Sequence, residues 1–208
     1  MSIQTVPAPS TKARVVPMQE APTYYRFSVQ QYHEMCKADI LTTEDRVELL
    51  DGLVVNKMSK KPPHTVATVL TREALQRVLP PDWHISVQDP VTTDTSEPEP
   101  DCSLVRGNAR QYLAAHPGPS DVGVAVEISE SSLHHDRTWK KSIYARARIP
   151  VYWIVNLIDN QIEVYTDPTG PAGEPDYRRR REYGSADEIP VLLDGNEVGR
   201  LPVRELLP

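Results

Sequence analysis

Three acidic residues of this 208-residue chain stand at positions where a carboxylate could bind a metal ion. Asp101 opens the short apolar segment Cys102–Val105, so its side chain would lie at the mouth of a buried strand. Glu127 lies at the end of Val122–Ile128, the most hydrophobic stretch of the chain, where a buried carboxylate is costly unless it is paired or binds a metal. Glu48, next to a turn, is the third candidate. From spacing alone, each could instead be structural, for example a glutamate paired with an arginine.

A lysine could add positive charge to such an acidic site. Asp136, Lys140 and Tyr144 are spaced by four residues, so in a helix they share one face. Lys140 could therefore reach the acids from a helix, whereas Lys141 lies about 100° further round and is expected in solvent. The alternative is an exposed Lys140 that only pairs with Asp136.

The histidines offer two further constellations. His64 follows Pro62-Pro63 at the start of an expected helix. It could hydrogen-bond a neighbouring loop, or it could contact a phosphate or a bound water. His134-His135-Asp136 has the composition of a metal cluster, but adjacent histidines in a loop usually point apart, so we do not expect ligation there.

The basic run Arg178–Arg181 lies between two tyrosines. On an alternating strand it presents two arginines to each face, and a positive face could touch a phosphate backbone. The interpretation that we favour is a solvated edge strand protected by charge.

Helices and strands alternate along the chain and must position these residues. Capping residues and apolar spacing predict helical segments over 28–35, 43–50, 64–79 and 136–147, with a helical turn at 111–115. In the third helix the expected apolar stripe is Val66, Val69, Leu70, Ala74, Leu75 and Val78. Strands are expected at 53–58, 83–93, 101–106, 122–128, 151–155, 162–165, 177–183, 189–193 and 198–203. The strand at 53–58 could form a hairpin with the residues before the Asp51-Gly52 turn. The fold class is therefore α/β, a mixed sheet flanked by a few helices.

Composition bounds the class of protein. Apolar residues make up 39% of the chain and charged residues 25%, which is typical of a globular domain. No apolar stretch approaches the roughly 18 residues of a membrane helix, so no membrane partner is expected. The net charge of −6 disfavours a non-specific nucleic-acid coat but not an acidic metal pocket.

Domain organisation and compartment also follow from composition. Residues 1–22 carry four prolines and no aromatic residue, which predicts a flexible leader before a single domain at 23–208. Cys36 and Cys102 are too few for a disulfide framework, which predicts a reducing cytoplasm. Gly-rich phosphate loops and a G-x-S-x-G elbow are missing from the sequence, so nucleotide-binding and serine-hydrolase functions have no support.

An ordered set of motifs resembles one protein family. The motifs are Glu48-Leu49-Leu50-Asp51-Gly52, His64, Pro100-Asp101, Val126-Glu127-Ile128-Ser129, Asp136-x3-Lys140-x3-Tyr144-Ala145 and Tyr152-Trp153-Ile154-Val155-Asn156. Together they resemble the Uma-two family of restriction endonuclease-like proteins, a branch of the PD-(D/E)XK nuclease superfamily. The resemblance runs from about Tyr24 to Pro208. It implies a restriction-endonuclease-like core, in which a mixed central sheet carries the acidic pair on a hairpin, with extra C-terminal strands.

The resemblance also implies roles for individual residues. Asp101 takes the place of the family's PD aspartate, Glu127 that of its second acid, and Glu48 that of the acid near the end of the first helix. These three, with the Ile128 carbonyl, would bind Mg²⁺ or Mn²⁺, because such ions favour oxygen ligands. The remaining expected contacts with substrate are His64, Ser129 and Tyr144.

One position departs from the superfamily pattern. The lysine expected two residues after the glutamate is replaced by Ser129. The family is expected to supply this lysine from the following helix, which assigns the role to Lys140. The catalytic set is therefore Glu48, Asp101, Glu127 and Lys140.

The function that follows is metal-dependent hydrolysis of phosphodiester bonds in DNA, since this chemistry needs charge neutralisation and a deprotonated water. Two alternatives stay open: a non-catalytic nuclease-fold module that binds nucleic acid or a protein, and a hydrolase of another phosphate ester. A homodimer is also expected, because the apolar segments 152–155 and 162–165 have few helices to cover them.

Overall fold

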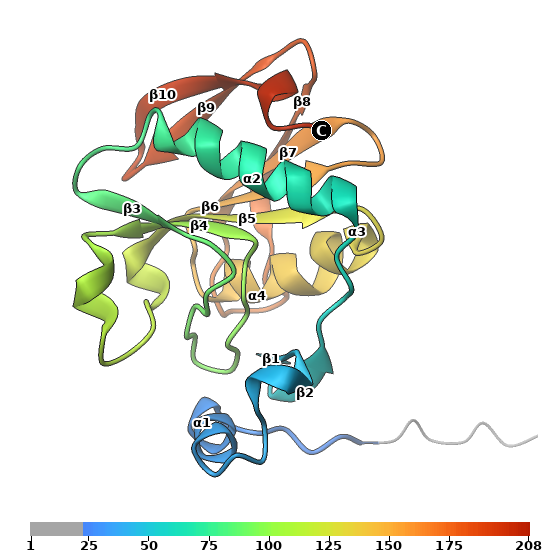
Figure 1. Cartoon of the computed structure of the whole chain (residues 1–208), viewed down its shortest axis with the longest axis vertical. Helices are drawn as coiled ribbons and strands as arrows, with labels where there is room; N and C mark the ends of the chain where they lie inside the picture. The colour runs from blue at the N-terminus through green and yellow to red at the C-terminus, as the bar shows by residue number, and fades with distance from the viewer. Residues whose placement is uncertain (1–22) are drawn as a thin grey trace, which may run out of the picture.

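A six-stranded sheet forms the centre of the protein, which a computed structural model describes over residues 23–208. The strand order is β3-β4-β5-β6-β7-β8; β5 and β6 run parallel and the other neighbours antiparallel (Figure 1). The strands are β3 Trp83–Ser86, β4 Cys102–Arg106, β5 Val122–Ser129, β6 Val151–Asn156, β7 Gln161–Pro168 and β8 Tyr177–Gly184. This confirms the α/β fold class. The expected leader, residues 1–22, lies outside the described part of the chain.

Strand β5 is buried along its whole length, as its apolar sequence predicts. Its side chains alternate between the two faces of the sheet. Val124 and Val126 pack against α2 (Pro62–Gln76) and the extra hairpin of β9 (Glu188–Leu193) and β10 (Asn196–Pro202). Ala125 packs on the opposite face against α3 (Leu133–His135) and α4 (Lys141–Arg146). Glu127, two residues further, therefore faces α3 and α4.

The helical connection from β5 to β6 contains a π-helical turn. Asp136–Lys140 form this turn between α3 and α4, an arrangement that recurs at functional sites. The expected shared face is present: Asp136, Lys140 and Tyr144 are all buried. Lys141 points elsewhere and pairs with Asp176 at 2.7 Å.

The N-terminal elements form a small unit below the central sheet in Figure 1, where Leu49 bridges to Glu97 in the connection before β4. Helix α1 (Val29–Lys37) begins at Ser28, whose side chain and that of Gln31 form a capping box. The prediction of a helical segment over 43–50 is wrong beyond the first turn. Arg46 adopts a left-handed conformation (φ 43°) that ends a 3-10 turn at Thr43–Asp45.

The residues after this turn form a hairpin, the alternative that the Asp51-Gly52 turn left open, and not a helix. β1 (Val47–Leu50) pairs with β2 (Leu53–Asn56) through the Asp51-Gly52 turn. Glu48 therefore lies on a strand and not near the end of a helix. In the hairpin, the backbone N–H and C=O groups of both strands are paired with each other. The cap at Thr42 supports only the single turn Thr43–Asp45.

Two other element predictions are wrong in detail. Val66 and Val69, expected in the apolar stripe of the long helix, are 46% and 44% exposed. The helix instead buries its smaller residues against the sheet, namely Ala67, Thr68, Thr71 and Ala74 together with Leu75. The strand expected at 83–93 ends at Ser86, because the chain turns at Gln88 with φ 59°.

The argument for a homodimer is also wrong, although the homodimer itself stays a prediction. Every residue of 152–155 and 162–165 is buried within the one chain. α2 and β9–β10 cover one face, and α3 and α4 cover the other. In the described residues, no helix has the length and apolar character needed to cross a membrane.

Candidate active site

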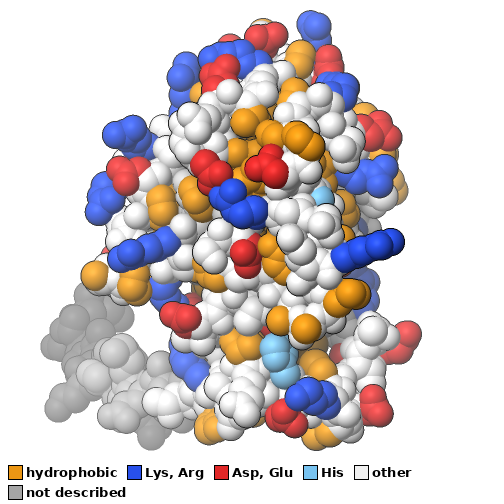
Figure 2. Space-filling model, turned by 90° about the vertical axis from the view of Figure 1, so that its left-hand side faces the viewer, with side chains coloured by type: hydrophobic (Ala, Val, Ile, Leu, Met, Phe, Trp, Pro, Cys, Tyr) orange, Lys and Arg blue, Asp and Glu red, His pale blue; other side chains and the backbone are white. Residues whose placement is uncertain are grey.

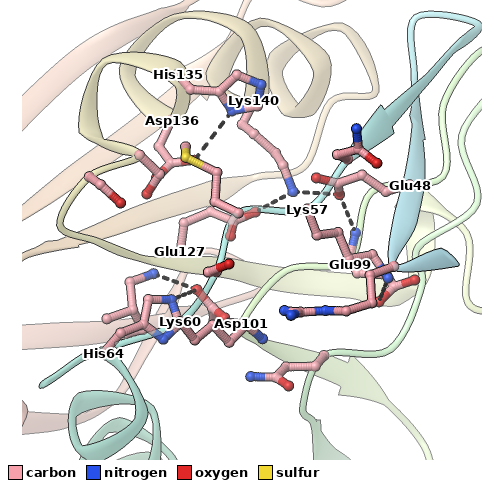
Figure 3. Close-up of a pocket in the computed structure, with 18 of the residues that line it drawn as sticks. Glu48, Lys57, Lys60, His64, Glu99, Asp101, Glu127, His135, Asp136 and Lys140 are labelled. Carbon is pink, nitrogen blue, oxygen red and sulfur yellow. Dashed lines mark hydrogen bonds and ion pairs between the residues drawn. The ribbon is translucent and has the colours of Figure 1, made fainter. Parts of the chain in front are cut away.

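A pocket of about 480 Å³ opens where β5 ends and the π-helical turn begins. It is lined by Glu48 of β1, His64 of α2, Asp101 before β4, Glu127 of β5 and Lys140 of the π-helical turn. Figure 3 shows these side chains converging from different elements on one space. The structure thus brings together all four residues of the expected catalytic set.

Asp101 and Glu127 are neighbours across two antiparallel strands. Cys102 pairs with Val126, so the same register continued by one residue places Asp101 opposite Glu127. Directly opposed residues in such a pair have Cα atoms about 4.5–5.5 Å apart. Two residues 26 positions apart in the chain are thereby fixed side by side, where β4 begins and β5 ends.

Glu127 is a buried carboxylate with few stabilising partners. It accepts a hydrogen bond from the Tyr144 hydroxyl at 2.6 Å and lies 3.2 Å from the Lys140 ammonium. Burial raises the pKa of Glu127 from 4.5 to about 8; Lys140 opposes this rise, while Asp136, Asp101 and Glu48 add to it. The site therefore holds more carboxylate charge than its own residues neutralise.

Lys140 lies between two carboxylates. Its ammonium donates to Glu48 Oε2 at 2.7 Å and lies 3.2 Å from Glu127 Oε1. Burial would lower its pKa, but the charges of Glu127 and Glu48 raise it above the usual value, so this lysine is charged. Glu48 is held in turn by the backbone N–H of Glu99 at 3.1 Å. The nearest carboxylate partners of Lys140 are thus Glu48 and Glu127, and Asp101 lines the same pocket.

Asp101 has a separate set of donors. Its Oδ2 accepts from the Ile128 backbone N–H at 2.9 Å and lies 3.0 Å from His64 Nε2. The ammonium of Lys60 lies 3.4 Å from Oδ1. Burial alone would raise the pKa of Asp101, but His64, the Ile128 amide and Lys60 together lower it below its usual value. The donors around Asp101 therefore stabilise its charged form. The structure places His64 in direct contact with this carboxylate.

Two expected substrate contacts do not line the pocket. Ser129 is fully buried, and its hydroxyl donates to Asp136 Oδ2 at 2.6 Å. Tyr144 is also fully buried, with its hydroxyl on Glu127. Both side chains hold acids of the site in place: Ser129, at the end of β5, donates to Asp136, and Tyr144, on α4, donates to Glu127.

Sequence reasoning missed a residue that joins the parts of the site. Asp51, in the β1–β2 turn, accepts from Trp139 Nε1 at 2.8 Å and pairs with Arg146. Trp139 precedes Lys140, and Arg146 ends α4. Asp51 thus fixes the hairpin that carries Glu48 against the helix that carries Lys140. Its sequence signal, a turn before glycine, indicates the turn but not its partners.

The donor chemistry of the pocket fits a hard divalent cation. Carboxylate oxygens are the ligands that Mg²⁺ prefers, and three acids line this one space. In residues 23–208, however, no three His, Cys, Asp or Glu side chains are grouped at the spacing of a metal centre. The Lys140 ammonium occupies the space between Glu48 and Glu127 in this arrangement. Asp101, Glu127, Glu48 and the Ile128 backbone are the groups that could hold the ion.

The mixed sheet with an acidic pair on adjacent strands defines a restriction-endonuclease-like fold. A family model described as "Putative restriction endonuclease" (Uma2) matches residues 29–197, and the chain belongs to this Uma2 family. A solved structure described as a putative nuclease belonging to DUF820, from Anabaena variabilis ATCC 29413, has a similar fold with a TM-score of 0.55. It shares 13% identity, and the match covers 82% of this chain and 94% of that chain. No curated protein matches. The expected family is therefore confirmed.

Proposed function

We propose that this protein is a metal-dependent nuclease that hydrolyses phosphodiester bonds in DNA. The observation that carries the proposal is the pairing of Asp101 and Glu127 on adjacent strand ends, with the Lys140 ammonium in the same pocket. Family membership supports a nuclease-like activity. The metal and the DNA substrate are the parts of the proposal that need a direct test.

The proposed ion, Mg²⁺ or Mn²⁺, would supply charge neutralisation at the phosphate and a water of lowered pKa. Asp101 is oriented for it by the Ile128 N–H and His64, and Glu127 by the Tyr144 hydroxyl. Lys140 would stabilise the negative charge that develops on the phosphate. Glu48 holds Lys140 in place before substrate binds.

The test is cleavage of supercoiled and single-stranded DNA with Mg²⁺, with Mn²⁺ and with EDTA. Wild type is compared with Asp101→Asn, which removes the charge and keeps the shape. Asp194→Asn is the matched control, because Asp194 is exposed and pairs with Arg106 away from the pocket. We expect metal-dependent nicking that Asp101→Asn abolishes and Asp194→Asn retains. Full activity of a folded Asp101→Asn variant would contradict the proposal.

A second candidate is a non-catalytic module of the same fold. The observation in its favour is that Lys140 forms ion pairs with both Glu48 and Glu127. These ion pairs already compensate part of the acidic charge without a metal. Binding of DNA with no cleavage under any metal condition would favour this candidate. Cleavage of a small phosphodiester but not of DNA would instead indicate another phosphate ester as the substrate.

A homodimer and a cytoplasmic location are also proposed. Light scattering at micromolar concentration should give about twice the 23.4 kDa mass of one chain, and a mass of one chain would contradict the dimer. The cytoplasm is proposed because Cys36 and Cys102 are both free thiols, one exposed and one buried.

A further inference from the structure

The connection between β2 and α2 is the most basic segment around the pocket. It contains Lys57, Lys60 and Lys61, which we call the lysine strap, and all three line the pocket. We infer that the lysine strap binds the backbone phosphates of a nucleic acid beside the phosphate at Asp101 and Glu127. The inference rests on the proposed function, since it deepens the account of how that site takes a polyanion.

Each strap lysine is paired with an acid of the pocket, two of them before β4 and one after β5. Lys57 lies 2.5 Å from Glu99 and Lys61 lies 3.1 Å from Glu130. Lys60 lies 3.4 Å from Asp101 (Figure 3). The strap thus runs along the pocket from the mouth of β4 to the end of β5, on the side where β5 meets α3 (Figure 1).

These ion pairs can be exchanged for contacts with phosphate. The strap side chains are 25%, 31% and 59% exposed, so water already solvates much of their charge. Of these pairs, the more exposed one between Lys61 and Glu130 contributes little to stability. The backbone of residues 57–61 forms neither helix nor strand, so the lysines can turn toward a ligand without breaking an element.

The charge of the pocket requires such a segment if a polyanion is to enter. Six carboxylates line it, from Glu48, Glu99, Asp101, Glu127, Glu130 and Asp136. Five Lys or Arg residues oppose them, and three of the five belong to the strap. Without the strap only Arg46 and Lys140 would remain, and the rim would repel nucleic acid.

The reach of the strap matches a nucleic-acid strand better than a single small phosphate. From Lys57 to Lys61 an extended chain spans at most about 13 Å. Phosphates along one strand of a duplex follow each other every 3.4 Å along the axis, so the strap is long enough to face more than one phosphate.

Other basic regions of the described chain are placed differently. Arg178 pairs with Asp167, and Arg180 pairs with Glu163 and Glu182, on the edge strand β8. None of the residues of β8 lines the pocket. On the face drawn in Figure 2, positive and negative side chains are interspersed. The strap therefore differs from these regions in placing three lysines around one opening.

The test compares two variants that lose the same charge. One carries Lys57→Gln, Lys60→Gln and Lys61→Gln; the matched control carries Arg178→Gln, Arg179→Gln and Arg181→Gln on β8. Binding of a fluorescent 20-nucleotide single strand, and of its duplex, is followed by anisotropy in EDTA over a range of NaCl concentrations. Thermal unfolding verifies that both variants are folded.

We expect the strap variant to bind at least tenfold more weakly than wild type. The slope of log K against log salt should fall by about 2 for the single strand and by nearly 3 for the duplex, since each of three lost phosphate contacts removes roughly 0.7 and 0.9, respectively. The β8 control should keep the slope of wild type. Inorganic phosphate at millimolar concentration should compete poorly; equal competition would assign the strap to small phosphates and overturn the inference.

The outcome separates this inference from the proposed function. Binding that depends on the strap in a protein that never cleaves would leave the strap inference standing and reject the nuclease. Metal-dependent cleavage with an unchanged salt slope in the strap variant would support the nuclease and reject the strap inference. Equal loss of binding in the strap variant and the β8 control would overturn the inference, because charge alone and not its position would then decide.

Discussion

Two buried glutamates lie in one row of the central sheet and have opposite surroundings. Glu127 of β5 pairs in register with Ile154 of β6, which pairs with Glu163 of β7. Both carboxylates are therefore on the same face, and they are 5% and 0% exposed. Residue type, strand context and burial are nearly the same, so the difference between them comes from their partners.

Glu163 is surrounded by donors. Arg137 donates to both of its oxygens, Arg180 lies 3.0 Å away, and the Tyr165 hydroxyl and Asn156 amide complete the set. Burial would raise the pKa of Glu163, but these donors, Arg137 first, lower it. Glu127 has only Lys140, which it shares with Glu48, and Tyr144.

The comparison teaches how to separate a structural from a functional buried acid. Glu163 is compensated inside the chain and ties the π-helical turn to β7 through Arg137. Glu127 is under-compensated and opens to a pocket. An incompletely paired carboxylate at a cavity is where an external cation can contribute.

The largest expected effect is on cleavage. Glu127→Gln should lower the rate of metal-dependent DNA cleavage by at least about a thousandfold, or about 4 kcal/mol of transition-state stabilisation, because it removes a proposed ligand. Glu163→Gln should stay within about threefold of wild type, measured on supercoiled DNA per mole of folded protein. Similar losses in both variants would break the distinction.

The second effect concerns the lysine that Glu127 shares. Lys140→Ala should reduce cleavage by two or more orders of magnitude, about 2.7 kcal/mol or more, while titration calorimetry shows little loss of metal affinity. The matched control is Lys141→Ala, whose side chain pairs with Asp176 instead. Equal activity of the two variants would remove Lys140 from the site.

The third effect is on the free energy of unfolding. Here the substitution of Glu163 should cost more than that of Glu127. Glu163→Gln should lower the free energy of unfolding by about 2 kcal/mol, because the Arg137 pair loses its charge. Glu127→Gln should leave it unchanged or raise it at pH 8, since it removes an under-compensated buried charge. Urea unfolding measures both, and a larger loss for Glu127→Gln would contradict the reasoning.

The dependence on pH should also have opposite signs. The raised pKa of Glu127 means that its protonated form favours the fold, so its contribution to stability is lost as pH rises from 4.5 to about 8. The lowered pKa of Glu163 means that its contribution is present above pH 4.5 and lost as pH falls below.

Melting temperatures of the wild type and both variants test this. The difference between Glu127→Gln and wild type should grow in favour of the variant from pH 5 to 8. The deficit of Glu163→Gln should shrink below pH 4. Parallel curves for all three proteins would show that neither group has a shifted pKa.

The smallest effect sharpens the account of Glu163. Arg180→Gln should lower the free energy of unfolding by about 0.5 kcal/mol, because Arg180 is 43% exposed and Arg137 remains in place. Arg137→Gln should cost more in the same urea titration. An equal cost would mean that the two arginines share the carboxylate evenly.

Much of the fold is local in origin and was predictable. The apolar run of β5 specifies a strand buried on both faces, and the Ser28 cap specifies where α1 begins. Spacing by four also brought Asp136, Lys140 and Tyr144 to one buried side, in spite of the π-helical turn. The hairpin around Glu48 was harder, because a left-handed residue at Arg46 overrides the helical signal of the preceding turn.

The sequence by itself determined which residues carry charge, which segments are apolar, and thus the acids and the lysine of the site. Only the tertiary structure decided their partners. Lys140 and Glu48 are 92 positions apart, and the strap lysines face acids on two other segments. Periodicity describes a residue's own element, whereas the pairing of charges depends on how strands align across the sheet. Because of that alignment, Glu127 lines a pocket with few partners, whereas Glu163 is paired on all sides within the chain.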